Sequence, residues 1–322
     1  EGLRALPRPE LLLRPFETRE AVLSSRIEGT RTTLEQALVQ EATTDEAELV
    51  DDDREVRNYG NALRAGVHSL ASGRPLSVYL LKDLHRELLR GTRGQEKRPG
   101  EFREHQVWIG PPSSKGEVRN ARFVPPPPLQ IDPCLQDLDS DLGEHYQLET
   151  IHPFLDGNGR IGRLLLGLQF VWEGVLDRTC LFVSPVLERR RQQYYDELLR
   201  VSVDGTFVGW VAFFLEVVIE SARETLDRLH RLRALHDEFA MRLRRLQSQK
   251  PAQLVQALFG LPYLTVPLAK TMLGVESATA QQSITKLAKV GILELLPERP
   301  KLGRGRPPKL YRCPAILDII RE

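Results

Sequence analysis

Hydrophobic positions recur at helical spacing over most of the chain. In residues 54–69, Val56, Tyr59, Leu63 and Val67 fall on one face of a helix, and residues 76–89 repeat this pattern. The same reasoning predicts further helices over residues 15–29, 33–42, 135–148, 161–172, 185–202, 207–246, 252–259, 265–273 and 277–290. We therefore expect a mainly α protein.

Residues 91–133 differ from this pattern because glycine and proline are dense there. Two short extended pieces, residues 106–109 and 122–124, alternate with turns. The run of prolines at 125–128 favours a stiff polyproline stretch over a helix. This part of the chain is predicted to form a small β-hairpin or flap.

The pattern changes again after Pro251. Three short predicted helices are followed by apolar strand-like runs at residues 291–295 and 309–312, with a basic segment rich in glycine and proline between them. Three helices followed by a hairpin form the outline of a small winged helix-turn-helix domain. These changes predict four segments, at residues 1–70, 71–225, 226–250 and 251–322.

Charge is distributed unevenly along the chain. The 322 residues carry 45 Lys and Arg against 44 Asp and Glu, a net charge of +1. Residues 241–322 alone hold 14 basic and five acidic residues, so the rest of the chain is net negative. A basic C-terminal block indicates a polyanionic partner, most simply a nucleic acid, although a solvated basic face would look the same.

Cysteine usage and hydropathy bear on location. The three cysteines, Cys134, Cys180 and Cys313, are far apart and form no CxxC pair. No run approaches the roughly 18 apolar residues of a membrane span, and the first eight residues lack the apolar core of a signal peptide. We therefore expect a cytoplasmic protein with no membrane partner.

Residues 152–163 gather the chemistry of a phosphate-handling site. Gly157, Asn158 and Gly159 tolerate unusual backbone angles and precede an apolar helix, whose free amides and positive dipole end favour an anion. Arg160 and Arg163 lie one turn apart and supply bidentate phosphate donors.

Two further residues complete this set. Asp156 is a hard oxygen ligand suited to Mg²⁺ beside phosphates, and His152 can act as a general base near neutral pH. The stretch lacks the Gly-Lys-Ser/Thr of a Walker loop, and no strand leads into it as in a dinucleotide fingerprint. Nucleotidyl or phosphoryl transfer is the predicted chemistry.

These twelve residues resemble the Fic family motif, His-x-Phe-x-(Asp/Glu)-Gly-Asn-Gly-Arg-x-x-Arg, at every fixed position. The resemblance implies a helical Fic core that uses ATP and Mg²⁺ to transfer AMP to a Ser, Thr or Tyr hydroxyl of a target protein, or of itself. It implies that His152 deprotonates the hydroxyl and that Asp156 holds Mg²⁺. The expected nucleotide-binding residues are Gly157, Asn158, Gly159, Arg160 and Arg163, with Arg163 on the γ-phosphate.

The resemblance extends on both sides of this motif, over residues 15–220. Residues 99–110 look like the family's flap, which would hold the target segment as an added strand. Tyr194 is a candidate for adenine contact, with core packing as the alternative. The expected target-binding residues of the flap are Gln106, Val107, Trp108, Ile109 and Gly110.

Residues 24–29 resemble the family's inhibitory motif, (Ser/Thr)-x-x-x-Glu-(Gly/Asn). The resemblance implies that Ser24 and Glu28 lie on an N-terminal inhibitory helix and that Glu28 pairs with Arg163, which takes the donors that the γ-phosphate needs. In some relatives this glutamate also activates a water that removes AMP. The sequence leaves open whether Glu28 does so here.

Other functions compete with this interpretation. A Doc-like kinase is a related possibility, but that branch has Lys where this chain has Gly159. A DNA-binding transcription regulator whose Fic core senses nucleotide is the second, through a winged helix. Homodimers are common among relatives, so we expect one here. The candidate DNA contacts are Gln281, Gln282, Lys286, Arg304 and Arg306.

Overall fold

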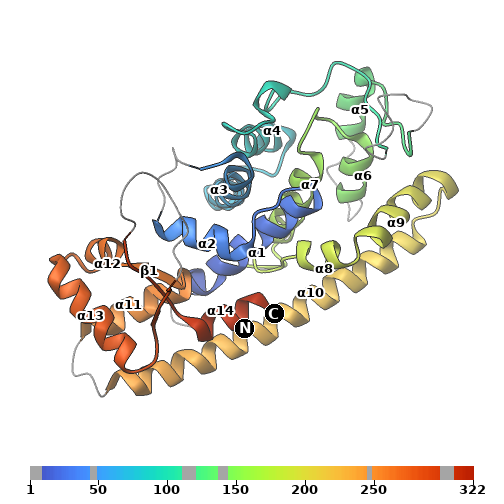
Figure 1. The fold of residues 1–322 in the computed structure, drawn as a ribbon. Helices are drawn as coiled ribbons and strands as arrows, with labels where there is room; N and C mark the ends of the chain where they lie inside the picture. Colours follow the sequence, from blue (N-terminus) through green and yellow to red (C-terminus); the bar gives the residue numbers. More distant parts are fainter. Residues whose placement is uncertain (1–8, 44–48, 111–120, 137–143, 245–248, 298–307) are drawn as a thin grey trace. The chain divides into compact units, whose positions relative to one another are not determined.

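A computed structural model of the protein describes residues 9–43, 49–110, 121–136, 144–244, 249–297 and 308–322 (Figure 1). It confirms a mainly α protein. The α-helices run over α1 Pro9–Ile27, α2 Leu34–Thr43, α3 Asp51–Ala71, α4 Val78–Leu88, α5 Ile131–Gln136, α6 Glu144–Ile151, α7 Asn158–Trp172, α8 Ser184–Arg189, α9 Arg191–Asp204, α10 Val208–Leu243, α11 Gln249–Gly260, α12 Val266–Leu273, α13 Ser277–Lys289 and α14 Pro314–Arg321.

The chain divides into two compact units. One comprises Leu23–Arg31 and Asp51–Ala222, and the other comprises Glu1–Val22, Thr32–Val50 and Arg223–Glu322. The first, which we call the motif unit, contains residues 152–163. The second, which we call the C-terminal unit, contains the basic block.

In the motif unit, α7 packs against α3, α4 and α6 (Figure 1). The apolar face of α3 faces inward as predicted, with Val56, Tyr59 and Leu63 buried. A second core gathers aromatic and aliphatic side chains from several helices. Its buried members are Ile27, Tyr146, Leu166, Val183, Val186, Leu187, Tyr194, Val201, Trp210, Phe213, Phe214 and Val217.

The C-terminal unit contains a three-stranded antiparallel sheet in the order β1-β3-β2. Its strands are β1 Tyr263–Thr265, β2 Glu294–Leu295 and β3 Leu310–Arg312. The two predicted strands are present in shortened form, while β1 and α14 were not predicted. Helix α2 packs on this sheet, where Leu38, Val39 and Ala42 contact the β1 residue Tyr263 and its neighbours.

Several predicted helices have different limits. The helix predicted over 161–172 begins at Asn158 because Gly157 takes left-handed angles and starts it earlier. The helix predicted over 185–202 is two helices that meet at Arg190. The helix predicted over 135–148 is replaced by α5 and α6, and residues 137–143 lie outside the described residues.

The predicted flap is held by one antiparallel bridge between Ile109 and Phe123. The Ile109 N–H donates to the Phe123 carbonyl at 2.8 Å, and the Phe123 N–H returns a bond at 3.0 Å. The proline run continues directly into a short 3₁₀ helix, η4 Pro128–Gln130, so its last residue is helical, contrary to the prediction. Proline fits there because the first turn of a helix needs no N–H from it.

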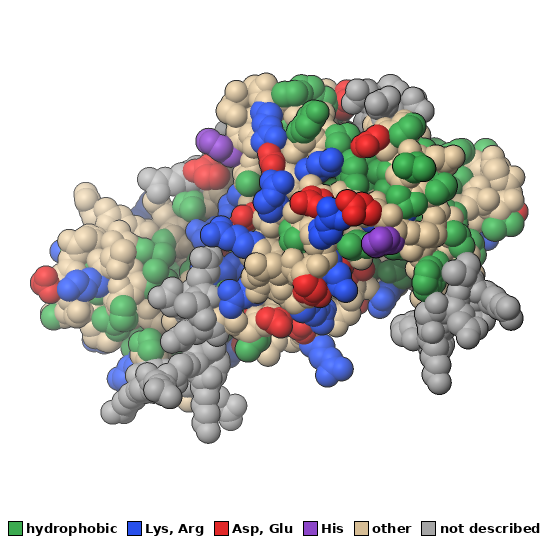
Figure 2. Space-filling model, turned by 90° about the horizontal axis from the view of Figure 1, so that it is seen from above, with side chains coloured by type: hydrophobic (Ala, Val, Ile, Leu, Met, Phe, Trp, Pro, Cys, Tyr) green, Lys and Arg blue, Asp and Glu red, His purple; other side chains and the backbone are tan. Residues whose placement is uncertain are grey.

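Acidic and basic side chains are interspersed on the face shown in Figure 2, in keeping with a net charge of +1. Among the helices that the structure describes, none combines the length and the apolar character needed to cross a membrane.

Candidate active site

The loop before α7 is fixed by its own side chains. Gly157, with φ of 79°, caps the helix without a side chain, and its N–H donates to Asp156 Oδ1 at 2.6 Å. The Asn158 amide bonds both ways to the backbone of Phe154, accepting from its N–H and donating to its carbonyl, each at 2.9 Å. The side chain of Asn158, a predicted nucleotide-binding residue, therefore bonds to the loop itself.

His152 sits on a strained turn at the end of α6, with φ of 50°. Its Nδ1 lies 3.3 Å from the Glu149 carbonyl, which can only accept, so Nδ1 carries the proton and Nε2 is the basic nitrogen. Burial lowers the pKa of His152 below its ordinary value. The imidazole is therefore neutral and able to accept a proton at neutral pH.

A buried arginine holds this turn in place. The Arg103 guanidinium donates to the carbonyls of His152 at 2.9 Å, Ile151 at 3.2 Å and Pro126 at 2.5 Å. Its side chain is among the largest that are fully buried. Arg103 is a charged donor to these backbone oxygens, so its hydrogen bonds offset the strain of the His152 turn. Arg103 itself lies outside the motif.

His85 supports the loop from the other side. Its ring stacks on Phe154 with centroids 3.8 Å apart. The Gly100 N–H donates to Nδ1 at 2.8 Å, so Nε2 carries the proton and donates to the Asp156 carbonyl at 2.9 Å. Burial lowers the pKa of His85 to about 4, which keeps it neutral and preserves this tautomer.

The two residues of the inhibitory motif meet Arg163. The Arg163 guanidinium donates through Nε to Ser24 Oγ at 2.9 Å, and through Nη2 to the Ser24 carbonyl at 3.0 Å and to Glu28 Oε1 at 2.7 Å. The Arg163 side chain is 1% exposed and that of Glu28 is 33% exposed. Helix α1 ends at Ile27, so Glu28 lies one residue beyond it rather than within it.

Electrostatics and space both favour this pair. Burial alone would raise the pKa of Glu28, but the charge of Arg163 and its hydrogen bond outweigh that, so the pKa lies below its ordinary value. A Cβ on Gly159 would fall 2.2 Å from Glu28 Oε1. The absence of a side chain at Gly159 is therefore what lets the Glu28 carboxylate reach Arg163.

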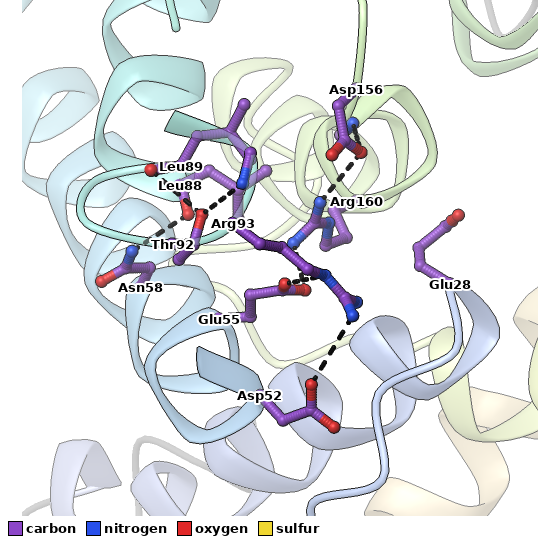
Figure 3. Close-up of polar contacts among 12 residues, drawn as sticks. Glu28, Asp52, Glu55, Asn58, Leu88, Leu89, Thr92, Arg93, Asp156 and Arg160 are labelled. Atoms are coloured by element: carbon purple, nitrogen blue, oxygen red, sulfur yellow. Dashed lines mark hydrogen bonds and ion pairs between the residues drawn. The ribbon is translucent and has the colours of Figure 1, made fainter. Parts of the chain in front are cut away.

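Arg160 points to two carboxylates rather than to open space (Figure 3). Its Nη1 donates to Glu55 Oε2 of α3 at 2.8 Å, and its Nη2 lies 3.3 Å from Asp156 Oδ1. The Asp156 side chain remains 41% exposed. Arg160 and Asp156 are thus neighbours, as their spacing predicts, and the second carboxylate comes from 105 residues away.

Part of the predicted site lines a cleft of about 520 Å³, whereas Asp156, Gly157, Asn158 and Arg160 are not among its lining residues. His152, Gly159 and Arg163 line it together with Glu28, so the imidazole, the start of α7 and the Glu28 carboxylate share one space. The remaining lining residues are Ile109, Gly110, Arg122, Phe123, Glu149, Thr150, Arg191, Tyr194, Tyr195, Leu198, Leu199 and Ser202.

The other predicted site residues fall in different places. Ile109 and Gly110 of the flap line the cleft, while Gln106 bonds to the carbonyls of Val107 and Pro125; Trp108 is half-buried. Tyr194 also lines the cleft, yet it is 1% exposed and its hydroxyl lies 3.0 Å from His145 Nε2. The burial and the hydrogen bonds of Tyr194 fit the core-packing alternative, and its contact with adenine stays a prediction.

The candidate DNA contacts lie in the C-terminal unit. Gln282 and Lys286 are exposed on α13, whereas Gln281 is half-buried and donates to the Tyr311 hydroxyl at 3.3 Å. Arg304 and Arg306 lie outside the described residues. DNA binding through a winged helix stays a prediction.

Sequence reasoning missed four side chains that shape the site: Glu55, His85, Arg103 and Glu149. Glu55, His85 and Glu149 lie on helices, and Arg103 lies in the predicted flap. Charged and polar side chains are usually exposed to solvent, so the full or partial burial of these four was not expected. A signal for Glu55 and His85 was available, because both fall on the same faces as the apolar positions of their helices. Their partners could not be read from spacing.

Glu149 provides a test of this electrostatic description. Burial raises the pKa of Glu149 to about 7, although the charge of Arg163 opposes the rise. The folded protein therefore binds this proton more tightly than the unfolded chain. The resulting stability is complete below about pH 4.5 and is lost as the pH rises through 7. Between pH 5 and 8 the parent should lose about 2 kcal/mol more stability than Glu149→Gln. Denaturant titrations at each pH measure this difference, and parallel curves would contradict it.

Comparisons with known proteins address the same segments. The Fic/DOC family N-terminal model matches residues 2–68 and the Fic/DOC family model matches residues 75–170, together half of the chain. Protein adenylyltransferase Fic of Drosophila willistoni is 26% identical over 207 residues, covering 62% of this chain and 39% of that protein. The Drosophila melanogaster protein of that name is 24% identical, covering 70% and 47%. The chain thus spans less than half the length of these relatives.

Solved structures agree on the fold. A Fic family protein from Desulfovibrio desulfuricans G20 has a TM-score of 0.54 and 23% identity, covering 96% of this chain and 91% of that one. A Fic domain containing signaling protein from Bacteroides thetaiotaomicron has a TM-score of 0.51 and 21% identity, covering 69% and 92%. With the motif at 152–163 and both family matches in place, the chain belongs to the Fic/DOC family.

Proposed function

We propose that this chain is a protein adenylyltransferase that Glu28 holds inactive. The observation that carries the proposal is the ion pair between Glu28 and Arg163 in the cleft that also contains His152. A base, a helix N-terminus and a buried arginine are the groups that AMP transfer needs, and the carboxylate occupies one of them. Relatives named protein adenylyltransferase support the same activity.

The reaction follows from these groups. His152 Nε2 would take the proton of the target hydroxyl as its oxygen attacks the α-phosphorus of ATP. The new bond joins that oxygen to phosphorus, the bond between the α-phosphorus and the bridging oxygen breaks, and pyrophosphate leaves. The Gly159 amide and the positive end of α7 would stabilise the charge on the phosphates. The bridged residues Ile109 and Phe123 would present the target segment as an extended strand.

The residues present fit Mg²⁺ that arrives with the nucleotide. Among the described residues, no group of three His, Cys, Asp or Glu could form a metal cage by itself. Mg²⁺ is commonly held by one or two carboxylates together with substrate phosphates, and Asp156 offers a half-exposed carboxylate beside the helix start. When bound, the ion would supply charge neutralisation at the α- and β-phosphates.

The inhibition is electrostatic and steric. With Glu28 bound, Arg163 has its donors on Ser24 and Glu28, and a negative charge lies where the γ-phosphate would bind. A charged hydrogen bond of this kind is worth about 1.5–3 kcal/mol, so its removal is expected to raise transfer by about tenfold or more.

Transfer of label from ATP tests the proposal. We expect Glu28→Gly to attach label from α-labelled ATP to itself or to lysate protein at least about tenfold faster than the parent. Glu220→Gly, which removes a carboxylate bound to Arg189 and Arg190, is the matched control and should match the parent. Transfer of γ-label instead would establish a kinase, and no transfer of either label would overturn the proposal.

A further inference from the structure

Glu55 is a buried carboxylate shared by two arginines. Its Oε2 accepts from Arg160 Nη1 at 2.8 Å, and its Oε1 accepts from Arg93 Nε at 2.8 Å (Figure 3). The side chains of Glu55 and Arg160 are 2% and 3% exposed. A carboxylate with so little access to water is costly unless it is paired, and removing one member of such a pair leaves a buried charge uncompensated.

The segment that carries Arg93 is held in place by hydrogen bonds. The Asn58 amide, one turn after Glu55 on α3, donates to the carbonyls of Leu88 at 3.1 Å and Arg90 at 2.8 Å. The Thr92 hydroxyl donates to the Leu89 carbonyl at 3.1 Å. These bonds fix the end of α4 and the turn after it, so Arg93 is presented to Glu55 by a defined backbone (Figure 3).

Arg93 differs from Arg160 in its exposure. Its side chain is 53% exposed and its Nη1 lies 3.8 Å from Asp52 Oδ1, a longer contact that contributes little. Arg93 therefore secures the outer oxygen of Glu55, while the inner oxygen holds Arg160. This division leaves Arg160 Nη2 directed toward Asp156, at the start of α7.

Arg160 thus has two carboxylate partners, one on each terminal nitrogen. The contact with Asp156 is longer, at 3.3 Å, and Asp156 is far more exposed than Glu55. If Glu55 were neutral, Asp156 would be the remaining carboxylate partner of Arg160, and that pairing would oppose both metal binding by Asp156 and phosphate binding by Arg160. With Glu55 charged, Arg160 stays anchored through Nη1 when Asp156 turns to the ion.

We propose that Glu55 is a positioning residue that anchors Arg160 for the nucleotide phosphates, and that Arg93 secures Glu55 in turn. The inference rests on the proposed adenylyl transfer for its kinetic readout. It adds residues from α3 and from the turn after α4 to the motif residues that would contact the nucleotide.

The test is a double-mutant cycle in the Glu28→Gly background. Glu55→Gln keeps the shape and removes the charge, and we expect it to lower kcat/KM for ATP at least tenfold. When Arg160 is already alanine, Glu55→Gln should have little further effect, because it acts through Arg160. Glu220→Gln is the matched control: its two oxygens are also held by two arginines, and it should not change kcat/KM.

The possible outcomes of this cycle distinguish a positioning role for Glu55 from a merely structural one. The inference is overturned if Glu55→Gln behaves like Glu220→Gln, or if its effect multiplies with that of Arg160→Ala, as a merely structural role would give. Should Glu55→Gln fail to fold, the half-exposed Arg93→Gln replaces it, with a smaller loss that is again absent in Arg160→Ala. If Glu28→Gly transfers no AMP, the proposed function fails by itself, and the same cycle measured by equilibrium binding of ATP still decides the role of Glu55.

Discussion

Replacing Arg163 with leucine is expected to lower the free energy of unfolding by about 3–5 kcal/mol. The Arg163 side chain is 1% exposed, and its loss strands the Ser24 hydroxyl and carbonyl as well as the Glu28 carboxylate. Unpaired buried polar groups carry the full cost of their desolvation. Denaturant unfolding followed by tryptophan fluorescence measures this, because Trp108, Trp172 and Trp210 all lie in the motif unit.

Arg189→Leu is the control for this experiment. Arg189 pairs with Glu220 at 2.7 Å, but its side chain is 41% exposed, and exposed pairs contribute about 0–1 kcal/mol. A loss of the same size in both variants would contradict the view that Arg163 is the buried centre of the contact with Ser24 and Glu28.

Replacing His152 with alanine in Glu28→Gly is expected to reduce AMP transfer by about 10²–10⁴-fold, the usual worth of a general base. Equilibrium binding of ATP should be nearly unchanged, because the imidazole acts on the target hydroxyl. Since burial lowers the pKa of His152, transfer by Glu28→Gly should already be at its plateau at neutral pH and decline only in acid. A rate that survives His152→Ala would assign the base to another group.

The sequence was most informative where chemistry is local. Residues 152–163 lie within one loop and one helix start, so their spacing alone places Asp156 beside Arg160. Glu28 could be identified because its own short motif marks it, although its partner is 135 residues away. The amphipathic helices around them followed from periodicity.

What could not be predicted depends on contacts distant in sequence. Glu55 and Arg103 are charged residues whose burial is decided by partners on other segments, and nothing in their spacing identifies those partners. Strand β1 has three residues and gains its hydrogen bonds only from β3, so no local pattern marks it. The break at Arg190, whose guanidinium pairs with Glu216 and Glu220, is likewise not marked by a proline or glycine at that position.

The close approach of Gly159 and Glu28 has a consequence for how this chain can evolve. A methyl group at position 159 would overlap the Glu28 carboxylate, whereas the other near contact, at 2.9 Å, is the flexible tip of Arg163. The two positions are therefore not independent. A side chain at 159 requires the Glu28 carboxylate to move away or to be lost, so a lineage that keeps the ion pair of Glu28 with Arg163 in this geometry must keep this glycine. The lack of space between position 159 and the Glu28 carboxylate therefore couples substitutions at the two positions.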